Sequence, residues 1–275
     1  MRKIVFLIFL LTFSIEIKAQ KKTEKNDNKF KIQYELNYVK DTLFPNKKEK
    51  EIFTLYIDNN LSKFVSNRKL HIDSLSSKAR KDNAFAMSLL ANLSKIPKTN
   101  FSFEIYKNSI TKEIVVIDKI IKNKYIYKDD YKNEWILTSD TLTIQNYKCQ
   151  KSLLNYRGRK YEAWYTTEIP ISNGPFKFQG LPGLIIKIND SKRDYSFELI
   201  GLIEDKNVNI AYPKEKDKWL ISTTLKEFKK TLLSSSKNYF SQIEMSGITL
   251  NKQGKKMFSN KLSEKLKNPI ELKIE

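Results

Sequence analysis

Short runs in which apolar and polar residues alternate recur along most of the sequence. In residues 31–39, KIQYELNYV, the side chains of Ile32, Tyr34, Leu36 and Tyr38 fall on one face and polar side chains on the other. This period of two is typical of a half-buried β-strand. Polar turns separate the runs, so the pattern predicts an antiparallel meander. The other runs are residues 51–66, 101–106, 113–118, 124–129, 135–156, 160–169, 184–190 and 194–205.

Two short polar segments, one inside a run and one between two runs, predict tight hairpins. Asp58-Asn59-Asn60 divides residues 51–66 with side chains that tolerate turn conformations. Arg157-Gly158-Arg159 lies between two alternating runs and predicts a second tight hairpin.

Three stretches instead have apolar residues at the three- to four-residue spacing of helices, namely residues 74–93, 224–243 and 255–268. Ser74 and Thr224 are the expected N-caps of the first two. The sequence therefore predicts an α+β fold. We expect a long, curved antiparallel β-meander of about ten strands, half-barrel-like, with two to three helices packed on its concave side.

The N-terminus has the pattern of a secretory signal peptide. Arg2 and Lys3 precede an apolar run that is too short for a membrane-spanning helix, and cleavage is expected after Ala19. Residues 20–29 are polar and predict a disordered lead-in, followed by a single domain over residues 30–275. The protein is expected to be exported to the periplasm or cell surface, soluble after cleavage.

The net charge of +20 favours anionic partners. The two classes of anionic partner are nucleic acid and an anionic membrane surface. The simpler alternative is a solvated, lysine-rich surface that has no partner. An exported protein rarely meets nucleic acid, and no basic helix with base-reading spacing is visible, so no nucleic-acid partner is expected.

Candidate catalytic residues are few. Cys149 is the only cysteine, so an internal disulfide is excluded; it is either a small buried apolar residue or a reactive thiol. His71, the only histidine, shows no sign of pairing with it, and one histidine with one cysteine is too few for zinc. Two carboxylate pairs, Asp129-Asp130 and Asp190 with Asp194, could act in glycosidase-like hydrolysis, but both lie in predicted turns, where aspartate is expected for turn geometry. The sequence contains no phosphate loop, nucleophile elbow or metalloprotease helix, so no catalytic residue, metal or cofactor is expected. The protein is also expected to be a monomer.

Glycine and proline cluster between the runs that end at Ile169 and begin at Leu184. Glycine permits positive φ or close backbone approach and proline fixes φ, so this segment predicts a rigid, specified turn. It is either a structural corner or a loop that presents Phe176, Phe178 and Leu181 as a binding lip. The loop residues are Gly174, Pro175, Gly180, Pro182 and Gly183.

These stretches carry a family resemblance. The sequence GLPGLI at residues 180–185 follows the segment 157–178, which begins with Arg-Gly-Arg. The match extends upstream to YKCQKSLLNYRGR at 147–159 and downstream to NPIEL at 268–272. Together they resemble the GLPGLI family of small exported proteins of Bacteroidetes-type bacteria. Ser152 stands where members often have alanine. The resemblance implies a signal peptide, a periplasmic or surface location and genes often near outer-membrane transport systems; it implies no catalytic residues.

Aromatic and basic residues near the loop predict a ligand surface. Arg157, Arg159, Trp164 and Tyr165, with Phe176, Phe178 and Leu181, form a concave apolar surface with a cationic rim, unless these aromatics belong to the core.

Three functions remain open from the sequence. The first is a non-enzymatic carrier or binding protein for a lipid or other apolar or amphipathic ligand at the outer membrane. The second is an accessory protein that docks on an outer-membrane transporter through residues 174–183. The third is a hydrolase or thiol enzyme that uses Cys149.

Overall fold

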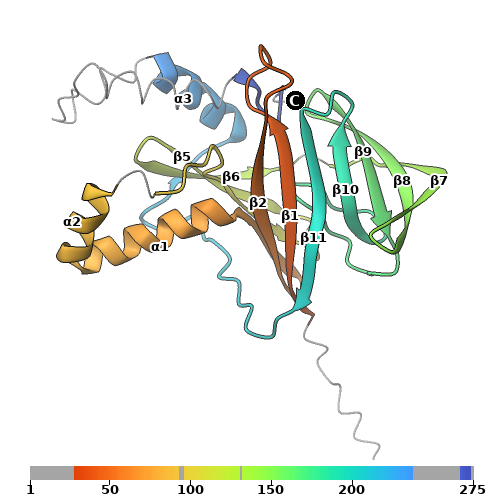
Figure 1. Cartoon of the computed structure of the whole chain (residues 1–275), viewed down its shortest axis with the longest axis horizontal. Helices are drawn as coiled ribbons and strands as arrows, with labels where there is room; N and C mark the ends of the chain where they lie inside the picture. Colours follow the sequence, from red (N-terminus) through yellow and green to blue (C-terminus); the bar gives the residue numbers. More distant parts are fainter. Residues whose placement is uncertain (1–27, 93–95, 131, 238–266, 274–275) are drawn as a thin grey trace, which may run out of the picture.

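The computed structural model describes residues 28–92, 96–130, 132–237 and 267–273, and its centre is one 12-stranded open sheet (Figure 1). The strands are β1 Lys29–Val39, β2 Lys48–Asp58, β3 Leu61–Ser66, β4 Glu104–Asn108, β5 Ile114–Ile120, β6 Asn123–Asp129, β7 Ile136–Ile144, β8 Tyr147–Tyr156, β9 Arg159–Thr166, β10 Leu184–Asp190, β11 Tyr195–Glu204 and β12 Ile221–Ser222. The helices are α1 Asn67–Lys81, α2 Asn83–Ala91 and α3 Leu225–Lys237.

The predicted fold class is confirmed, but the strand order differs from a single consecutive meander. The order is β12-β6-β5-β4-β3-β2-β1-β11-β10-β9-β8-β7. Two meanders, β1–β6 and β7–β11, are joined where β1 pairs antiparallel with β11, and β12 adds a short parallel pairing to β6. Alternation defines strands but not their neighbours, so the sequence could not predict this pairing.

Both predicted hairpins form. Asn59, between β2 and β3, has a φ of 54°, in the left-handed region that asparagine tolerates. Arg157 and Gly158, between β8 and β9, have φ values of 46° and 85°, which is the pattern of a two-residue hairpin turn with positive φ at both central residues.

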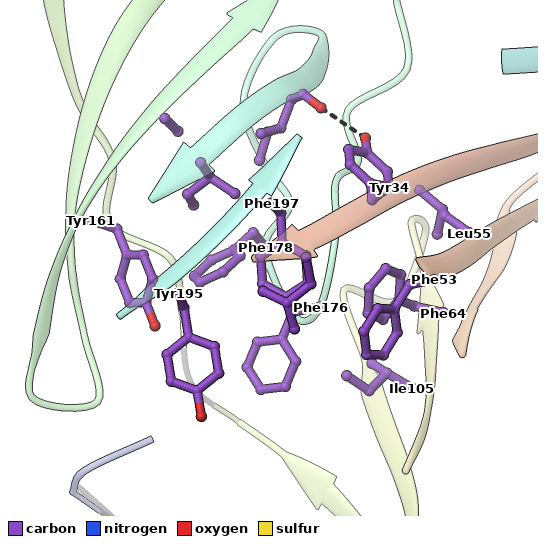
Figure 2. Packing of buried hydrophobic residues seen from close by; sticks show 14 of the residues in the cluster. Tyr34, Phe53, Leu55, Phe64, Ile105, Tyr161, Phe176, Phe178, Tyr195 and Phe197 are labelled. Atoms are coloured by element: carbon purple, nitrogen blue, oxygen red, sulfur yellow. Dashed lines mark hydrogen bonds between the residues drawn. The ribbon is translucent and has the colours of Figure 1, made fainter. Parts of the chain in front are cut away.

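The main core lies on the concave side of the curved sheet, where side chains from both meanders meet. Phe53 of β2 stacks on Phe64 of β3 with ring centroids 4.9 Å apart, and Phe197 of β11 contacts both rings edge-on. Figure 2 shows the rings of Phe176 and Phe178, from the loop before β10, between the core residues of the two meanders. The loop therefore fills the space that the curvature leaves.

A second, smaller core lies on the opposite face of β4–β6. Val115 and Ile117 of β5 point to this side, where residues after β11 cover them with Val208, Ile210 and Leu220. Both faces of β5 are thus buried over residues 114–117, which explains why these four consecutive residues are apolar.

The helix predicted over 74–93 is different in the structure. Two helices form, and their N-caps are Ser66 and Asp82 rather than Ser74. Asp82 has an extended backbone, and its carboxylate accepts a hydrogen bond from the amide of Phe85 at 2.9 Å, which ends one helix and begins the next. The buried Ser66 hydroxyl accepts from the Lys69 amide at 3.2 Å, so α1 begins directly where β3 ends.

The start of α3 matches the prediction, because the Thr224 hydroxyl accepts a hydrogen bond from the amide of Glu227 at 3.2 Å. Leu225 and Phe228 of α3 pack on the concave core. Several predictions lie outside the described residues: the signal peptide 1–19, almost all of the lead-in 20–29, the apolar positions Tyr239 and Ile243, and nearly all of the helical pattern 255–268. Lys29, the last residue of the predicted lead-in, already belongs to β1. Within the described ranges no helix is long and apolar enough to cross a membrane.

Candidate functional site

The loop between β9 and β10 is largely buried inside the concave side. Phe176, Phe178 and Leu181 are all at most 2% exposed. They therefore do not form the exposed lip that was one of the two predictions, because the two meanders leave an apolar space that these side chains fill. Within residues 174–183 only Gln179, Gly180 and Pro182 reach the surface.

Two glycines of the loop are explained by geometry, as the structural-corner interpretation expects. Gly180 has a φ of +98°, a conformation that side chains disfavour. A Cβ on Gly183 would lie 1.9 Å from the carbonyl oxygen of Thr166, so the β9 backbone approaches where only glycine fits. Phe176 also has a positive φ, 53°, which is rare for a bulky residue and often marks a functional site.

A buried lysine from β4 holds this loop. Nζ of Lys107 donates hydrogen bonds to the carbonyl oxygens of Gly174, Phe176 and Phe178, at 2.8, 3.1 and 3.3 Å. Lys107 is 1% exposed, and no carboxylate in the described part of the chain forms an ion pair with it. Burial lowers the pKa of Lys107 to about 7, because the ammonium loses its water.

This lysine should make stability depend on pH. The pKa of Lys107 is about 7 in the folded protein, whereas an unfolded-chain lysine has a pKa of about 10.4. The unfolded state therefore binds more protons between these values, and the unfolding free energy should rise with pH across this window, by at most about 1.4 kcal/mol per pH unit. We expect Lys107→Met to remove this rise, measured by urea unfolding at about pH 7 and about pH 9. The exposed Lys206→Met is the control; equal slopes in wild type and Lys107→Met would contradict the prediction.

A buried charge cluster connects the Arg-Gly-Arg hairpin with the loop. Nη2 of Arg157 donates to Oδ1 of Asp129 at 2.9 Å, and Nζ of Lys177 contacts Oδ2 of the same Asp129 at 2.6 Å. Lys177 also donates to Oε1 of Glu271 at 2.7 Å, which accepts from the Tyr156 hydroxyl at 2.8 Å. Burial opposes the charge of Lys177, but Glu271 and the other neighbouring acidic groups hold its pKa well above the usual value. The pKa of Glu271 is lowered despite burial, chiefly by Lys177.

The second arginine of the hairpin binds the C-terminal segment, residues 268–273. Nη1 of Arg159 contacts the carboxylates of Asp190 and Asp194, at 2.8 and 3.0 Å. Its Nη2 donates to Oδ1 of Asn268 at 2.5 Å and to the carbonyl oxygen of Pro269 at 2.9 Å. The backbone adds two more bonds, because the amides of residues 272 and 273 both donate to the carbonyl oxygen of residue 157. The hairpin therefore anchors the NPIEL sequence to the sheet.

A pocket of about 140 Å³ lies where these elements meet. Its walls come from the concave side of β4–β6, from α3, from the loop and from the C-terminal segment. We call it the aromatic pocket, because seven aromatic rings line it, those of Tyr38, Phe101, Phe103, Tyr127, Phe176, Tyr195 and Phe228. Phe103 contacts Phe176 with ring centroids 5.6 Å apart, and Tyr127 contacts Phe228 at 5.2 Å.

The structure places the residues predicted to bind a ligand in different surroundings: one lines the aromatic pocket, and the others lie in the core, in ion pairs or elsewhere on β9. Phe176 lines the aromatic pocket, whereas Phe178 and Leu181 lie in the core beside it. Arg157 and Arg159 are buried ion-pair partners rather than a rim. Two further residues lie on β9 away from the pocket: the half-buried Trp164, whose indole donates to Glu162 at 3.0 Å, and Tyr165, whose hydroxyl donates to Gln150 at 2.9 Å.

Cys149 lies in the core at 1% exposure, and burial raises the pKa of its thiol, which disfavours the reactive thiolate. His71 lies exposed on α1. In the described ranges, no group of three or more His, Cys, Asp or Glu side chains is placed to hold a metal ion.

Sequence reasoning singled out Arg157 but missed the other charged residues of the cluster beside the pocket. Asp129 was assigned to a turn, and Lys107, Lys177, Lys229 and Glu271 were not singled out. Lys177 did carry a signal, because a lysine between two phenylalanines in a rigid loop is in an apolar setting. Its partners could not be found this way, since they lie 48 and 94 residues away.

Comparisons with known proteins give a family match and a weak structural one. Residues 156–187 match the model of a family described as "Protein of unknown function (Porph_ging)". No curated protein matches the chain. Two solved structures of PNGF-II, in space groups C2 and P21, are similar with TM-scores of 0.49 and 0.48 and 14% identity, covering 76% of this chain. The chain spans about a third of their length, 33% and 34%.

The family match covers the hairpin, the loop and the start of β10, which are the residues that anchor the C-terminal segment and line the pocket. It confirms the resemblance to an uncharacterised family, under a description other than the GLPGLI name. Over residues 156–187 this chain is therefore similar to a family of unknown function.

Proposed function

We propose that the protein is a non-enzymatic binding protein that takes a small apolar or amphipathic ligand in the aromatic pocket. The observation that carries this proposal is the pocket itself, with seven aromatic rings around a space of about 140 Å³. Ligand sites are typically concave and lined by aromatic side chains with a few polar groups. The left-handed backbone of Phe176 adds support, because such strain is costly and tends to occur at functional sites.

The size of the pocket limits the ligand. A cavity of about 150 Å³ lined by apolar side chains holds a molecule the size of benzene, whereas drug-sized ligands occupy roughly 300–1,000 Å³. We infer that the aromatic pocket takes one ring or a short acyl segment, so that a longer lipid would insert only a part of its chain.

A second, wider cleft of about 710 Å³ borders the loop at Gln179 and Gly180. Its lining includes Glu113, Lys128 and Asp130 and contains no aromatic side chain. Lys128 is already paired with Glu113 at 2.9 Å. This cleft is therefore less suited to an apolar ligand than the aromatic pocket.

The predicted signal peptide supports export, and we propose that the protein binds its ligand in the periplasm or at the cell surface, in service of the outer membrane. Docking on an outer-membrane transporter through residues 174–183 stays a prediction. The structure offers it little surface, because only Gln179, Gly180 and Pro182 of this loop are accessible.

Filling the pocket should abolish binding. Leu232 of α3 lines the pocket, and Leu233 beside it is 49% exposed. We expect ligand-observed NMR to detect binding of 3-phenyl-1-propanol to wild type and to Leu233→Trp, but not to Leu232→Trp, because the indole would occupy the space of the ligand. Thermal unfolding and far-UV circular dichroism of all three proteins check that the fold is intact.

Two results would contradict the proposal. One is that neither 3-phenyl-1-propanol nor 1-hexanol binds the wild-type protein at millimolar concentration. The other is that Leu232→Trp folds and binds as well as Leu233→Trp, which would place the ligand elsewhere on the protein.

A further inference from the structure

The charges of the described residues beside the aromatic pocket do not balance. Among these residues, the buried cluster has three cations, Arg157, Lys177 and Lys229, but only two carboxylates, those of Asp129 and Glu271, so its cations exceed its carboxylates by one. Arg157 and Lys177 contact their carboxylates at 2.6–2.9 Å. The excess positive charge therefore lies with the remaining cation, Lys229.

Lys229 is the most loosely paired member of this cluster and lines the pocket. Its Nζ lies 3.6 Å from Oε2 of Glu271 and donates to the carbonyl oxygen of Lys273 at 3.2 Å. Glu271 is at the same time bound by Lys177 and Tyr156 through its other oxygen. Burial lowers the pKa of Lys229, and the nearby Lys177 and Arg157 act in the same direction. An additional anion at this position would relieve the repulsion among the three cations.

The other charged groups of the pocket are engaged. Asp118 on β5 accepts hydrogen bonds from the Ser102 hydroxyl and from the amide of Lys119. Lys40 lies 3.7 Å from Glu49. The negative charge of Asp118 disfavours an anion at its own side of the pocket. The charges therefore favour an anionic ligand and also orient it, with its anionic group toward Lys229.

From this arrangement we propose that the ligand of the aromatic pocket is an amphiphile with a single carboxylate, which forms an ion pair with Nζ of Lys229 while the apolar body lies among the rings. This inference rests on the proposed function and names its ligand class. The carboxylate of a short aromatic acid and that of an acyl chain have the same chemistry at Lys229.

Matched acid and alcohol pairs test the inference. The affinities of 3-phenylpropionate and 3-phenyl-1-propanol, and of hexanoate and 1-hexanol, are measured by titration calorimetry or NMR on wild type, Lys229→Gln and Lys230→Gln. Lys230 is the exposed neighbour on the same helix and its substitution removes the same charge. We expect each acid that binds to bind about tenfold more tightly than its alcohol, since charge-assisted hydrogen bonds are about twice as strong as neutral ones.

The expected result is that this preference persists in Lys230→Gln, is lost in Lys229→Gln and is largely kept in Lys229→Arg. The pair that binds more tightly distinguishes an aromatic from an acyl source of the carboxylate. Alcohols that bind as well as acids to wild type, or an unchanged preference in Lys229→Gln, would overturn the carboxylate inference and leave the apolar pocket standing. Absence of binding by both acids and alcohols would overturn the proposed function as well.

Discussion

Lys177→Met is expected to lower the unfolding free energy by about 3–5 kcal/mol, the usual cost of breaking a buried ion pair by removing one partner. Lys177 is 2% exposed and bridges Asp129 at 2.6 Å and Glu271 at 2.7 Å. Methionine keeps most of the side-chain volume but leaves two buried carboxylates with one cation fewer between them. Urea unfolding at neutral pH measures the loss.

A surface pair provides the matched control. Lys50 lies 2.8 Å from Glu35, but the Lys50 side chain is 67% exposed, so Lys50→Met should cost at most about 1 kcal/mol. In the double variant Lys177→Met/Glu271→Gln, part of the loss should be recovered, because one of the two buried carboxylates that lose Lys177 is also removed. If Lys177→Met costs no more than Lys50→Met, the buried cluster does not stabilise the anchoring of the C-terminal segment.

Gly183→Ala is expected to destabilise the protein by at least about 3 kcal/mol or to prevent folding, at the upper end of overpacking effects. The added Cβ would lie 1.9 Å from the carbonyl oxygen and 2.6 Å from the carbonyl carbon of Thr166, and both are backbone atoms. Backbone cannot rotate away as a flexible side chain does, so β9 and β10 would have to separate. Thermal unfolding, or the yield of soluble protein if none unfolds cooperatively, measures the effect.

Gly201→Ala is the control for this substitution. Gly201 also lies in a strand, β11, but its added Cβ would meet only the end of the Gln33 side chain, at 3.7 Å. Ordinary van der Waals contact predicts a change within about 1 kcal/mol. Equal stability of Gly183→Ala and Gly201→Ala would show that the close approach of Thr166 is not a constraint.

The aromatic residues that the sequence predicts as one ligand surface are separated in the structure. Phe176 lines the aromatic pocket, but Phe178 of the loop and Tyr165 of β9 are core residues that do not line it. The remaining rings of the pocket come from distant segments, for example Tyr38 of β1 and Phe228 of α3. A single sequence shows that aromatic residues alternate along a strand, but not which strands bring them together.

Most of the strands, both hairpins and the start of α3 could be predicted from the sequence alone, whereas the bounds of α1 and α2 could not. Alternation predicted the long strands, the positive-φ residues Asn59 and Gly158 predicted the hairpins, and Thr224 predicted the start of α3, because each depends on neighbours within a few residues. Three features emerge only in the folded chain: β1 pairs with β11, the loop between β9 and β10 fills the core, and Lys177 contacts Asp129 and Glu271. These contacts join residues tens to hundreds of positions apart. Their partners are selected by the shape and charge of the folded whole, which leaves no periodic pattern in the chain.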